Sequence, residues 1–338
     1  GARLFMAALA VSMLLFNHIN ADGIILSVLL LAVIGLLSTM AGGIRSVIYT
    51  DALQCAVYVT AALVVLVYLY SSLNLPWPVL LEALRHPIDQ DGSKLLLLDF
   101  SVDFSSNGVF NIWSALTGFV LLNIAAFGMD QDMTQRVLTC QNREAAGRAL
   151  LSSVLMVIPT MLVFMLIGLL LYLFYQRPDL YQPGHAYARE FAGENVTVFM
   201  YYVLNELPSG LRGLVVVGVI AAALSTITSG LNAMASVLVA DIYKPWKLRR
   251  QANISERHFV KAGQAGMLLT AAALSVMAVL CFYWQQYSDM PLLAFALSVM
   301  VFSYSGLLGV FFTALFSQRG NRYSVTAALL SGFCVTLL

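Results

Sequence analysis

The stretch AAALSTITSGLNAMASVLVADIY, from Ala221 to Tyr243, joins long apolar runs to a cluster of hydroxyl side chains. In an α-helix, residues spaced by three and four positions share one face, so this stretch collects small and hydroxyl-bearing residues on a single stripe. The stripe consists of Ala222, Ser225, Thr226 and Ser229.

The stripe has the chemistry of a site for a hard cation. The carbonyl oxygen of one helical residue lies close to the hydroxyls three and four positions later, which gives three converging neutral oxygens. Such trios occur twice, as Ala222 with Ser225 and Thr226, and as Ser225 with Thr228 and Ser229. Na⁺ at membrane depth is held by carbonyls and hydroxyls of this kind. The alternative is a packing face, since small residues let membrane helices approach closely, and periodicity alone leaves both readings open.

The composition predicts a membrane protein of the all-α class. Of 338 residues, 60% are hydrophobic and 10% are charged, and the mean hydropathy is +0.84. A soluble domain usually carries about 25% charged residues, so this chain has too little polar surface to enclose a water-soluble core. The net charge of +1 gives no electrostatic case for binding nucleic acid.

Neither the cysteines nor the other reactive residues suggest an enzyme. The four cysteines lie in apolar sequence without CxxC spacing, which argues against a disulfide framework or a zinc site. We expect them to be buried apolar residues. The sequence contains no HExxH motif or carboxylate pair that would suggest hydrolysis.

Nine apolar segments are candidates for membrane spans, each judged against the roughly 20 residues needed to cross about 30 Å of hydrocarbon. They lie near residues 3–20, 22–42, 46–71, 109–129, 149–175, 211–240, 256–284, 291–316 and 323–338.

The orientation follows from the basic residues, because cytoplasmic loops of membrane proteins retain Lys and Arg. If the turn at 42–46 faces the cytoplasm, 13 of the 18 Lys and Arg residues lie inside and 5 lie outside. The connections 72–108 and 176–210 are then expected to face outward. The linker Asp241–Lys261 is expected to face the cytoplasm.

Asp51 is the one acidic residue that the predicted spans place inside the bilayer, in the segment GGIRSVIYTDALQ at 42–54. A charge in the middle of a membrane helix costs about 2.5–3.5 kcal/mol on insertion scales and indicates an ion pathway. The alternative is a carboxylate that pairs with Arg45 or reaches water. Because Arg45 lies six residues away, it belongs to a different face of the helix.

Asn123, Phe127 and Gln131 recur at intervals of four. On one continuous helix they would form a single face with two amides around an aromatic ring, which suits a polar solute. The alternative for Asn123 is a hydrogen bond between helices, worth about 0.6 kcal/mol on average.

Taken together, these stretches resemble the sodium:solute symporter family, which includes sodium–glucose, proline, pantothenate and sialic acid transporters. The resemblance is closest to the bacterial members that are like sialic acid transporters. The matching motifs occur in the family's order across nearly the whole chain. They are GGIRSVIYTDALQ (42–54), NxxxFxxxQDxxQR (123–136), AAALSTITSGLNAMASVLVADIY (221–243) and GLLGVFFTALFSQR (306–319).

The resemblance implies a leucine-transporter-like fold of two inverted five-helix repeats. The nine segments would correspond to core helices three to eleven. We therefore expect residues 1–338 to form a single transmembrane symporter domain, as a fragment that lacks the first two core helices and is truncated at its C-terminus.

The resemblance also implies two sodium sites. Ala222, through its carbonyl, and Ser225 and Thr226, through their hydroxyls, would form half of sodium site two, the other half coming from the first core helix. In the sialic-acid-transporter-like members a second sodium lies between the fifth and eighth core helices. The matching residues here are Asp51, Ser225, Thr228 and Ser229.

For the solute, Asn123 matches an asparagine that binds sugar in the sodium–galactose member, and Phe127 and Gln131 complete the expected substrate site. The aromatic gate of that member is Ala126 here, so its closure does not carry over. The implied function is sodium-coupled import of a small polar organic solute (sugar, sialic acid, amino acid or carboxylate) by alternating access. The expected location is the cell membrane, as a multi-pass protein of the bacterial inner membrane. The alternative is a symporter-like sensor module fused to a signalling domain.

Overall fold

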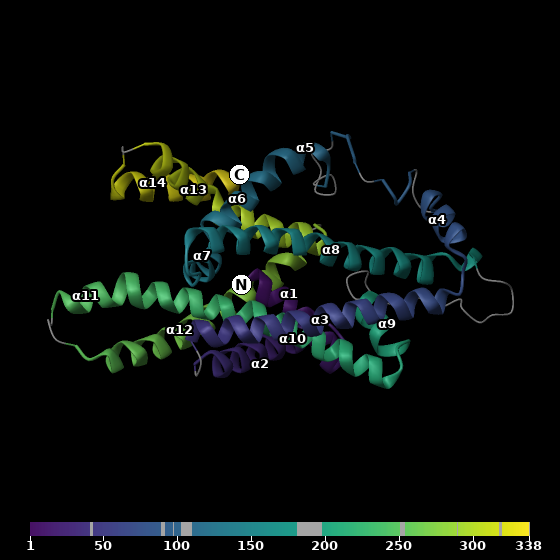
Figure 1. Ribbon diagram of the computed structural model, residues 1–338, viewed down its shortest axis with the longest axis horizontal. Coiled ribbons are helices and arrows are strands. Elements are labelled where there is room, and N and C mark those ends of the chain that lie inside the picture. The colour runs from purple at the N-terminus through teal and green to yellow at the C-terminus, as the bar shows by residue number, and fades with distance from the viewer. Residues whose placement is uncertain are drawn as a thin grey trace. The chain divides into compact units, whose positions relative to one another are not determined.

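The computed structural model describes residues 1–40, 43–88, 92–96, 98–102, 110–180, 198–250, 254–288, 290–317 and 320–337, and in this part of the chain the regular structure is helical (Figure 1). It divides into two compact units. The α3/α8 unit comprises Met6–Leu97 and Gln141–Thr228. The α6/α13 unit comprises Gly1–Phe5, Leu98–Cys140 and Ser229–Leu338.

The long helices alternate with short helical segments at their ends and in the connections. In chain order they are α1 (Ala2–Phe16), α2 (Ala21–Met40), α3 (Gly43–Leu73), α4 (Trp77–Arg85), α5 (Ile112–Ser114), the π-helical η1 (Ala115–Phe119), α6 (Val120–Gly128), α7 (Gln131–Leu138), α8 (Arg143–Gln176), the 3₁₀ turn η2 (Pro178–Leu180), α9 (Val198–Asn205), α10 (Ser209–Val237), the π-helical η4 (Leu238–Tyr243), α11 (Lys244–Leu248), α12 (Glu256–Gln286), α13 (Leu292–Phe316) and α14 (Arg322–Leu337).

Each of the nine predicted apolar segments coincides with a helix or a helical run of the described chain. Six helices are long and apolar enough to cross a membrane, and a seventh span is possible if the α5–α6 run and α7 count as one bent element. Helices α1 and α14 are shorter apolar helices. The chain is therefore a polytopic, all-α membrane protein, as predicted.

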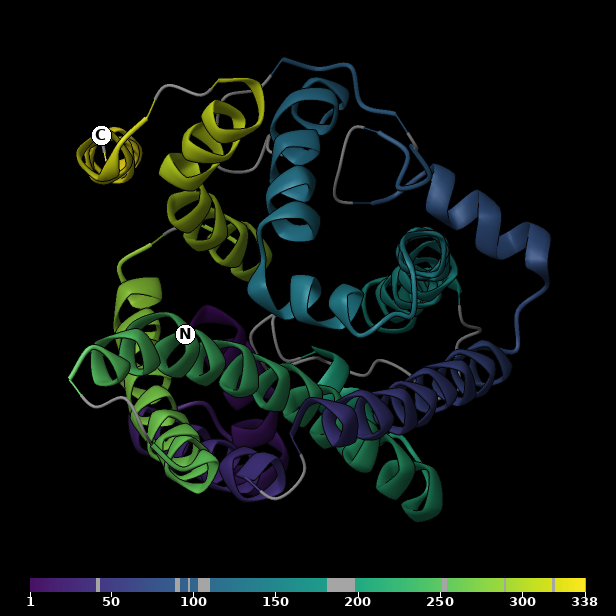
Figure 2. The same ribbon diagram turned by 60° about the vertical axis from the view of Figure 1, so that its left-hand side comes forward.

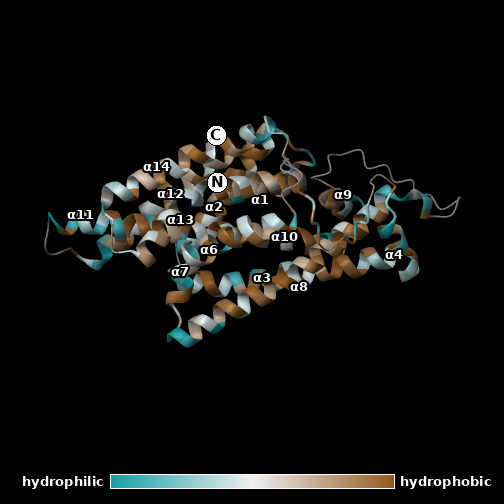
Figure 3. Ribbon diagram, turned by 90° about the horizontal axis from the view of Figure 1, so that it is seen from above, coloured by the Kyte–Doolittle hydropathy of each residue, from teal (hydrophilic) through white to brown (hydrophobic). Residues whose placement is uncertain are grey.

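The apolar surface of these helices is typical of a protein surrounded by lipid. On α8, the side chains of Leu155 and Met156 are 65% and 70% exposed. Figure 3 shows long hydrophobic stretches along the helices and hydrophilic residues toward their ends and in the connections. A water-soluble protein would not leave so many large apolar side chains exposed.

The α3/α8 unit has a core formed by one face each of α3 and α8, with α4 and α9 packed against it. On α3, Val65, Leu69 and Leu73 recur every four residues, and their exposed fractions are 0%, 0% and 2%. From α8, the Phe174 ring meets the Tyr202 ring of α9 edge-on, with the centroids 5.3 Å apart. This core fixes the C-terminal half of α3.

Helices α3 and α10 lie close together at Gly218. A methyl group added to Gly218 would lie 3.0 Å from the Cβ of Ala61 and 3.3 Å from the Cα of Tyr58. Glycine favours this close approach, because a β-carbon would push against the neighbouring helix.

In the α6/α13 unit, α13 and α14 also pack with glycines at their contact. The backbones of Gly306 and Gly332 touch, and the Phe302 and Phe333 rings lie 4.4 Å apart between centroids. Helix α13 runs without a break from Leu292 to Phe316. Gly306 therefore serves close packing in this helix.

The prediction that all four cysteines are buried is wrong. They are free thiols, and Cys281 is buried, Cys140 is partly buried, and Cys55 and Cys334 are exposed. Both exposed cysteines belong to apolar helices, α3 and α14, whose outer faces are suited to lipid rather than to a protein core.

Candidate sodium site

Asp51 and Ser225 meet where α3 and α10 cross within the α3/α8 unit. The Ser225 hydroxyl donates a hydrogen bond of 2.8 Å to Oδ1 of Asp51. Two helical turns away, Tyr58 of α3 lies against Gly218 of α10. Residue numbers rise along one helix as they fall along the other, so the two helices are antiparallel and the glycine contact sets the register of the Asp51–Ser225 pair.

The Asp51 carboxylate is buried, with 7% of the residue exposed. Thr228, one turn from Ser225, is 4% exposed. Its hydroxyl donates a hydrogen bond of 3.2 Å to the Ser225 carbonyl. Ser229 follows on the same helix and is 6% exposed. A carboxylate at this depth has its charge compensated by hydrogen-bond donors or by a cation, because an isolated buried charge is costly.

Two of the three oxygens of the first predicted trio meet on α10. The Thr226 hydroxyl donates a hydrogen bond of 3.3 Å to the carbonyl of Ala222, whereas the neighbouring Ser225 hydroxyl bonds to Asp51. Each hydroxyl oxygen that donates a hydrogen bond can still accept one or hold a cation.

The donor set fits Na⁺ better than a transition metal. It consists of one carboxylate with hydroxyl and carbonyl oxygens, the ligands that hard cations take. Among the described residues, no group of three or more His, Cys, Asp and Glu side chains could hold a metal ion. These α10 residues are suited to hold sodium, and Asp51 would supply the negative charge.

The structure adds one oxygen that the sequence analysis missed. Gln54 lies one turn beyond Asp51 on α3, and its Oε1 atom is buried without a hydrogen-bond partner in the described chain. A buried acceptor without a donor is costly, and a cation would satisfy it. The sequence feature that could have predicted it is the spacing of three residues between Asp51 and Gln54, which places both on one face of α3. The side chain of Arg45, the alternative partner of Asp51, lies outside the described side chains.

The predicted solute face is interrupted by a bend. Helix α6 ends at Gly128, and the run from Ile112 to Gly128 makes an angle of 50° with α7 (Figure 2). Asn123 and Phe127 lie on α6, but Gln131 begins α7. The expectation of one continuous face is therefore wrong for Gln131. The break lies at Met129, which ends α6, and at Asp130, whose extended backbone and side chain cap the start of α7.

Asn123 is exposed, and its amide nitrogen is hydrogen-bonded within its own helix. Its Nδ2 atom donates a hydrogen bond of 2.7 Å to the carbonyl of Phe119. Phe127 is half-buried. The amide oxygen of Asn123 can still accept a hydrogen bond from a solute.

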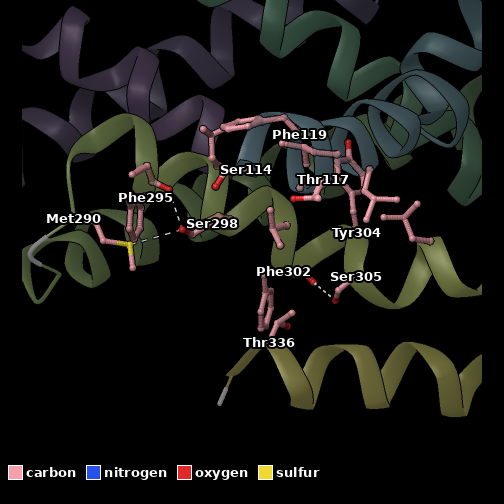
Figure 4. Close-up of a pocket in the computed structure, with 18 of the residues that line it drawn as sticks. Ser114, Thr117, Phe119, Met290, Phe295, Ser298, Phe302, Tyr304, Ser305 and Thr336 are labelled. Carbon is pink, nitrogen blue, oxygen red and sulfur yellow. Dashed lines mark hydrogen bonds between the residues drawn. The ribbon is translucent and has the colours of Figure 1, made fainter. Parts of the chain in front are cut away.

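The α6/α13 unit contains a cavity of about 680 Å³ between the α5–α6 run and α13, bordered by the ends of α12 and α14 (Figure 4). Its lining is mainly apolar and contains no charged side chain. The hydroxyl groups of the lining belong to Ser114, Thr117, Ser288, Ser298, Tyr304, Ser305 and Thr336. The predicted substrate residues Asn123, Phe127 and Gln131 do not line it, so sequence analysis missed this cavity.

The described helices, with a buried carboxylate among hydroxyls, are those of a polytopic membrane protein that has a polar site between its helices. The chain belongs to the sodium:solute symporter family, whose pattern matches residues 4–332. The family is one of transporters and not of enzymes.

Two relatives show how far the likeness extends. The chain is 26% identical to the human sodium/iodide cotransporter over 324 residues, which is 96% of this chain and 47% of that protein. It is 23% identical to the sodium/sialic acid symporter NanT of Aliivibrio fischeri over 315 residues, covering 92% of this chain and 57% of the relative. The chain thus spans about half the length of these relatives.

A solved structure confirms the fold. It is the substrate-bound, outward-open state of a Na⁺-coupled sialic acid symporter, described as revealing a novel Na⁺ site. It superposes with a TM-score of 0.65 at 19% identity, covering 99% of this chain and 72% of that one. The leucine-transporter-like fold is therefore confirmed.

Proposed function

We propose that the protein is a sodium-coupled secondary active transporter that imports a small polar organic solute by alternating access. The observation that carries the proposal is the buried Asp51 carboxylate bonded to Ser225 on the hydroxyl-bearing helix α10. The relatives reported above are transporters by name, which favours transport over the alternative of a sensor module.

The residues of this chain would supply ligands to two sodium sites. Ala222, Ser225 and Thr226 would hold one sodium through neutral oxygens. Asp51 would hold a second together with Ser225, Thr228 and Ser229. Each positive charge moved inward adds about 2.3 kcal/mol per 100 mV of membrane potential, so a second sodium raises the solute gradient that transport can sustain.

Sodium at these oxygens would hold α3 and α10 together and favour the outward-open arrangement. Release toward the cytoplasm would follow when the arrangement inverts and the oxygens separate. The membrane would be the cell membrane, and the bacterial inner membrane if the relationship to NanT extends to location.

The solute site would include Asn123 and Phe127 on α6 together with the hydroxyl-lined cavity. The absence of charged side chains from the cavity lining suits the neutral, hydroxyl-bearing part of a solute. Sugars, sialic acids, amino acids and carboxylates all contain such parts. Gln131, beyond the bend, would face the path toward the cytoplasm.

The test is a thermal-shift assay of the full-length protein with glucose, sialic acid, proline and pyruvate, each in sodium chloride and in choline chloride. A ligand that binds only the folded protein adds about 2.7 kcal/mol of stability at 100 times its Kd. We expect at least one of these solutes to raise Tm in sodium chloride only. Equal stabilisation in choline chloride would contradict sodium coupling.

A further inference from the structure

Helix α7, just beyond the 50° bend, is hydrogen-bonded on two sides within the α6/α13 unit. At its start, Oδ1 of Asp130 accepts from the backbone N–H of Asp132 at 3.0 Å, which caps the helix. The other carboxylate oxygen, Oδ2, accepts a hydrogen bond of 2.9 Å from the hydroxyl of Tyr304 on α13. One carboxylate therefore both begins α7 and connects it to α13.

Tyr304 connects this carboxylate to the cavity. Its side chain belongs to the cavity lining, where Figure 4 labels it near Ser305 and Thr117. A hydrogen bond to a carboxylate is stronger than one between neutral groups. A change in the position of the Tyr304 ring would therefore be transmitted to the start of α7.

The second connection runs from α7 to α10. Nδ2 of Asn232 donates a long hydrogen bond of 3.4 Å to Oε1 of Gln135. Asn232 lies on α10 four residues after Thr228 and seven after Ser225, so it continues the face that carries the candidate sodium oxygens. A shift of α10 about its axis would therefore reach Gln135.

We propose that α7 couples sodium binding on α10 to the cavity beside α13, through Asn232–Gln135 on one side and Asp130–Tyr304 on the other. This inference rests on the proposed function. Asp130, Gln135, Asn232 and Tyr304 are positioning residues in it, because they hold α7 and do not themselves bind sodium. Coupling of this kind changes the affinity at one site when the other is filled, and it is reciprocal.

The native Cys140, two residues beyond the end of α7, provides a readout that needs no identified solute. It is partly buried, and its sulfur lies 4.0 Å from the carbonyl of Arg136 on α7. In the full-length protein with every other cysteine replaced by alanine, a maleimide would label Cys140 at a rate that depends on the position of α7.

The experiment compares labelling rates in saturating sodium chloride and in choline chloride of the same ionic strength. If sodium favours the outward-open arrangement, sodium slows labelling of Cys140 in the parent by about fivefold, the lower end of typical coupling. Asn232→Leu abolishes this sodium effect. The matched control Asn205→Leu keeps it, since within the described residues the Asn205 amide bonds to Tyr201 of its own helix.

The second arm tests the connection to the cavity. A Ser298→Cys variant, in a background that lacks Cys140 as well, reports on the cavity lining. We expect sodium to change the labelling rate of this cysteine, and Tyr304→Phe to remove that change. The control is Tyr283→Phe, at an exposed tyrosine on α12, and it should keep the sodium effect.

Binding of radioactive sodium is measured on the same preparations, so that two failures can be told apart. If the parent binds sodium but labelling is insensitive to it, or if Asn232→Leu and Tyr304→Phe leave the sodium effects intact, the coupling role of α7 is overturned and the sodium site stands. If the parent binds no sodium, the proposed function and this inference both fall.

Discussion

At the scale of single residues, the account depends on the charge of Asp51. Asp51→Asn keeps a side chain of similar size and an oxygen that can accept from Ser225, but it removes the charge. We expect the sodium concentration for half-maximal binding to rise about tenfold or more, which corresponds to about 1.4 kcal/mol. The measurement is a sodium titration of the full-length protein.

The matched control for Asp51→Asn is the neighbouring Thr50→Ala. The Thr50 side chain is exposed, and its hydrogen bonds in the part of the chain that the structure describes go to the carbonyls of Ser46 and Val47 in its own helix. The control should keep the parent's sodium dependence. An Asp51→Asn protein with unchanged sodium dependence would remove Asp51 from the site.

The candidate site was partly predictable because helical spacing is local information. The spacing of Ser225, Thr226 and Thr228 along α10 follows from the sequence alone. The pairing of Asp51 with Ser225, 174 positions apart, does not follow from spacing. Only the family resemblance implied it, and the packing of α3 on α10 brings the two side chains to 2.8 Å. The buried oxygen of Gln54 was missed for the same reason.

At the scale of helices, the close crossing of α3 and α10 holds the site together. Gly218→Leu would force the helices apart, and such overpacking typically costs about 1–3 kcal/mol. We expect a lower Tm and weaker sodium binding together. Gly213→Leu is the control on the same helix, because an added side chain meets open space there. Equal Tm values for the two variants would contradict the role assigned to the close crossing at Gly218.

Arg177 at the end of α8 holds the short helix α4. Its guanidinium donates to the carbonyls of Ala83 at 2.6 Å and His86 at 3.0 Å, and pairs with Asp179 at 2.9 Å. The hydrogen bond from Arg177 lowers the pKa of the Asp179 carboxyl. A carboxyl whose pKa is lowered by folding stabilises the protein above its unfolded pKa, and this contribution is lost as the pH falls through the folded value.

The pH dependence of the Tm of Asp179→Asn follows from this lowered pKa. The Tm difference between parent and variant should be largest near neutral pH and should shrink as the pH falls below about 4, the ordinary range of an aspartate. Glu82→Gln is the control, because Glu82 pairs with His86 on an exposed surface, where ion pairs contribute little. A Tm difference that is constant with pH would contradict the role assigned to the Arg177–Asp179 pair.

Helix positions were predictable from hydropathy, but helix irregularities were not. The apolar segment at 109–129 predicted a plain span, whereas the chain contains the π-helical η1 and the bend before α7. The hydrogen bond between Asp130 and Tyr304 links residues 174 positions apart, and no local pattern indicates it. Long-range polar contacts of this kind depend on which helices pack together.

At the scale of the whole molecule, low charge predicted the membrane, and the motifs predicted the family and its fold. The substrate was not predictable in the same way. Its site depends on the shape of a cavity between helices, here lined by hydroxyls and apolar side chains that look like ordinary membrane-helix residues in the sequence.

The central claim is that the oxygens of α10 bind sodium, and equilibrium binding of radioactive sodium to the purified full-length protein tests it most directly. The decisive variant combines Ser225→Ala with Thr226→Ala, which removes two hydroxyls and keeps the helix. The account predicts saturable binding in the parent and at least about a tenfold rise in Kd in the variant, about 1.4 kcal/mol. Equal sodium affinity in parent and variant would contradict it.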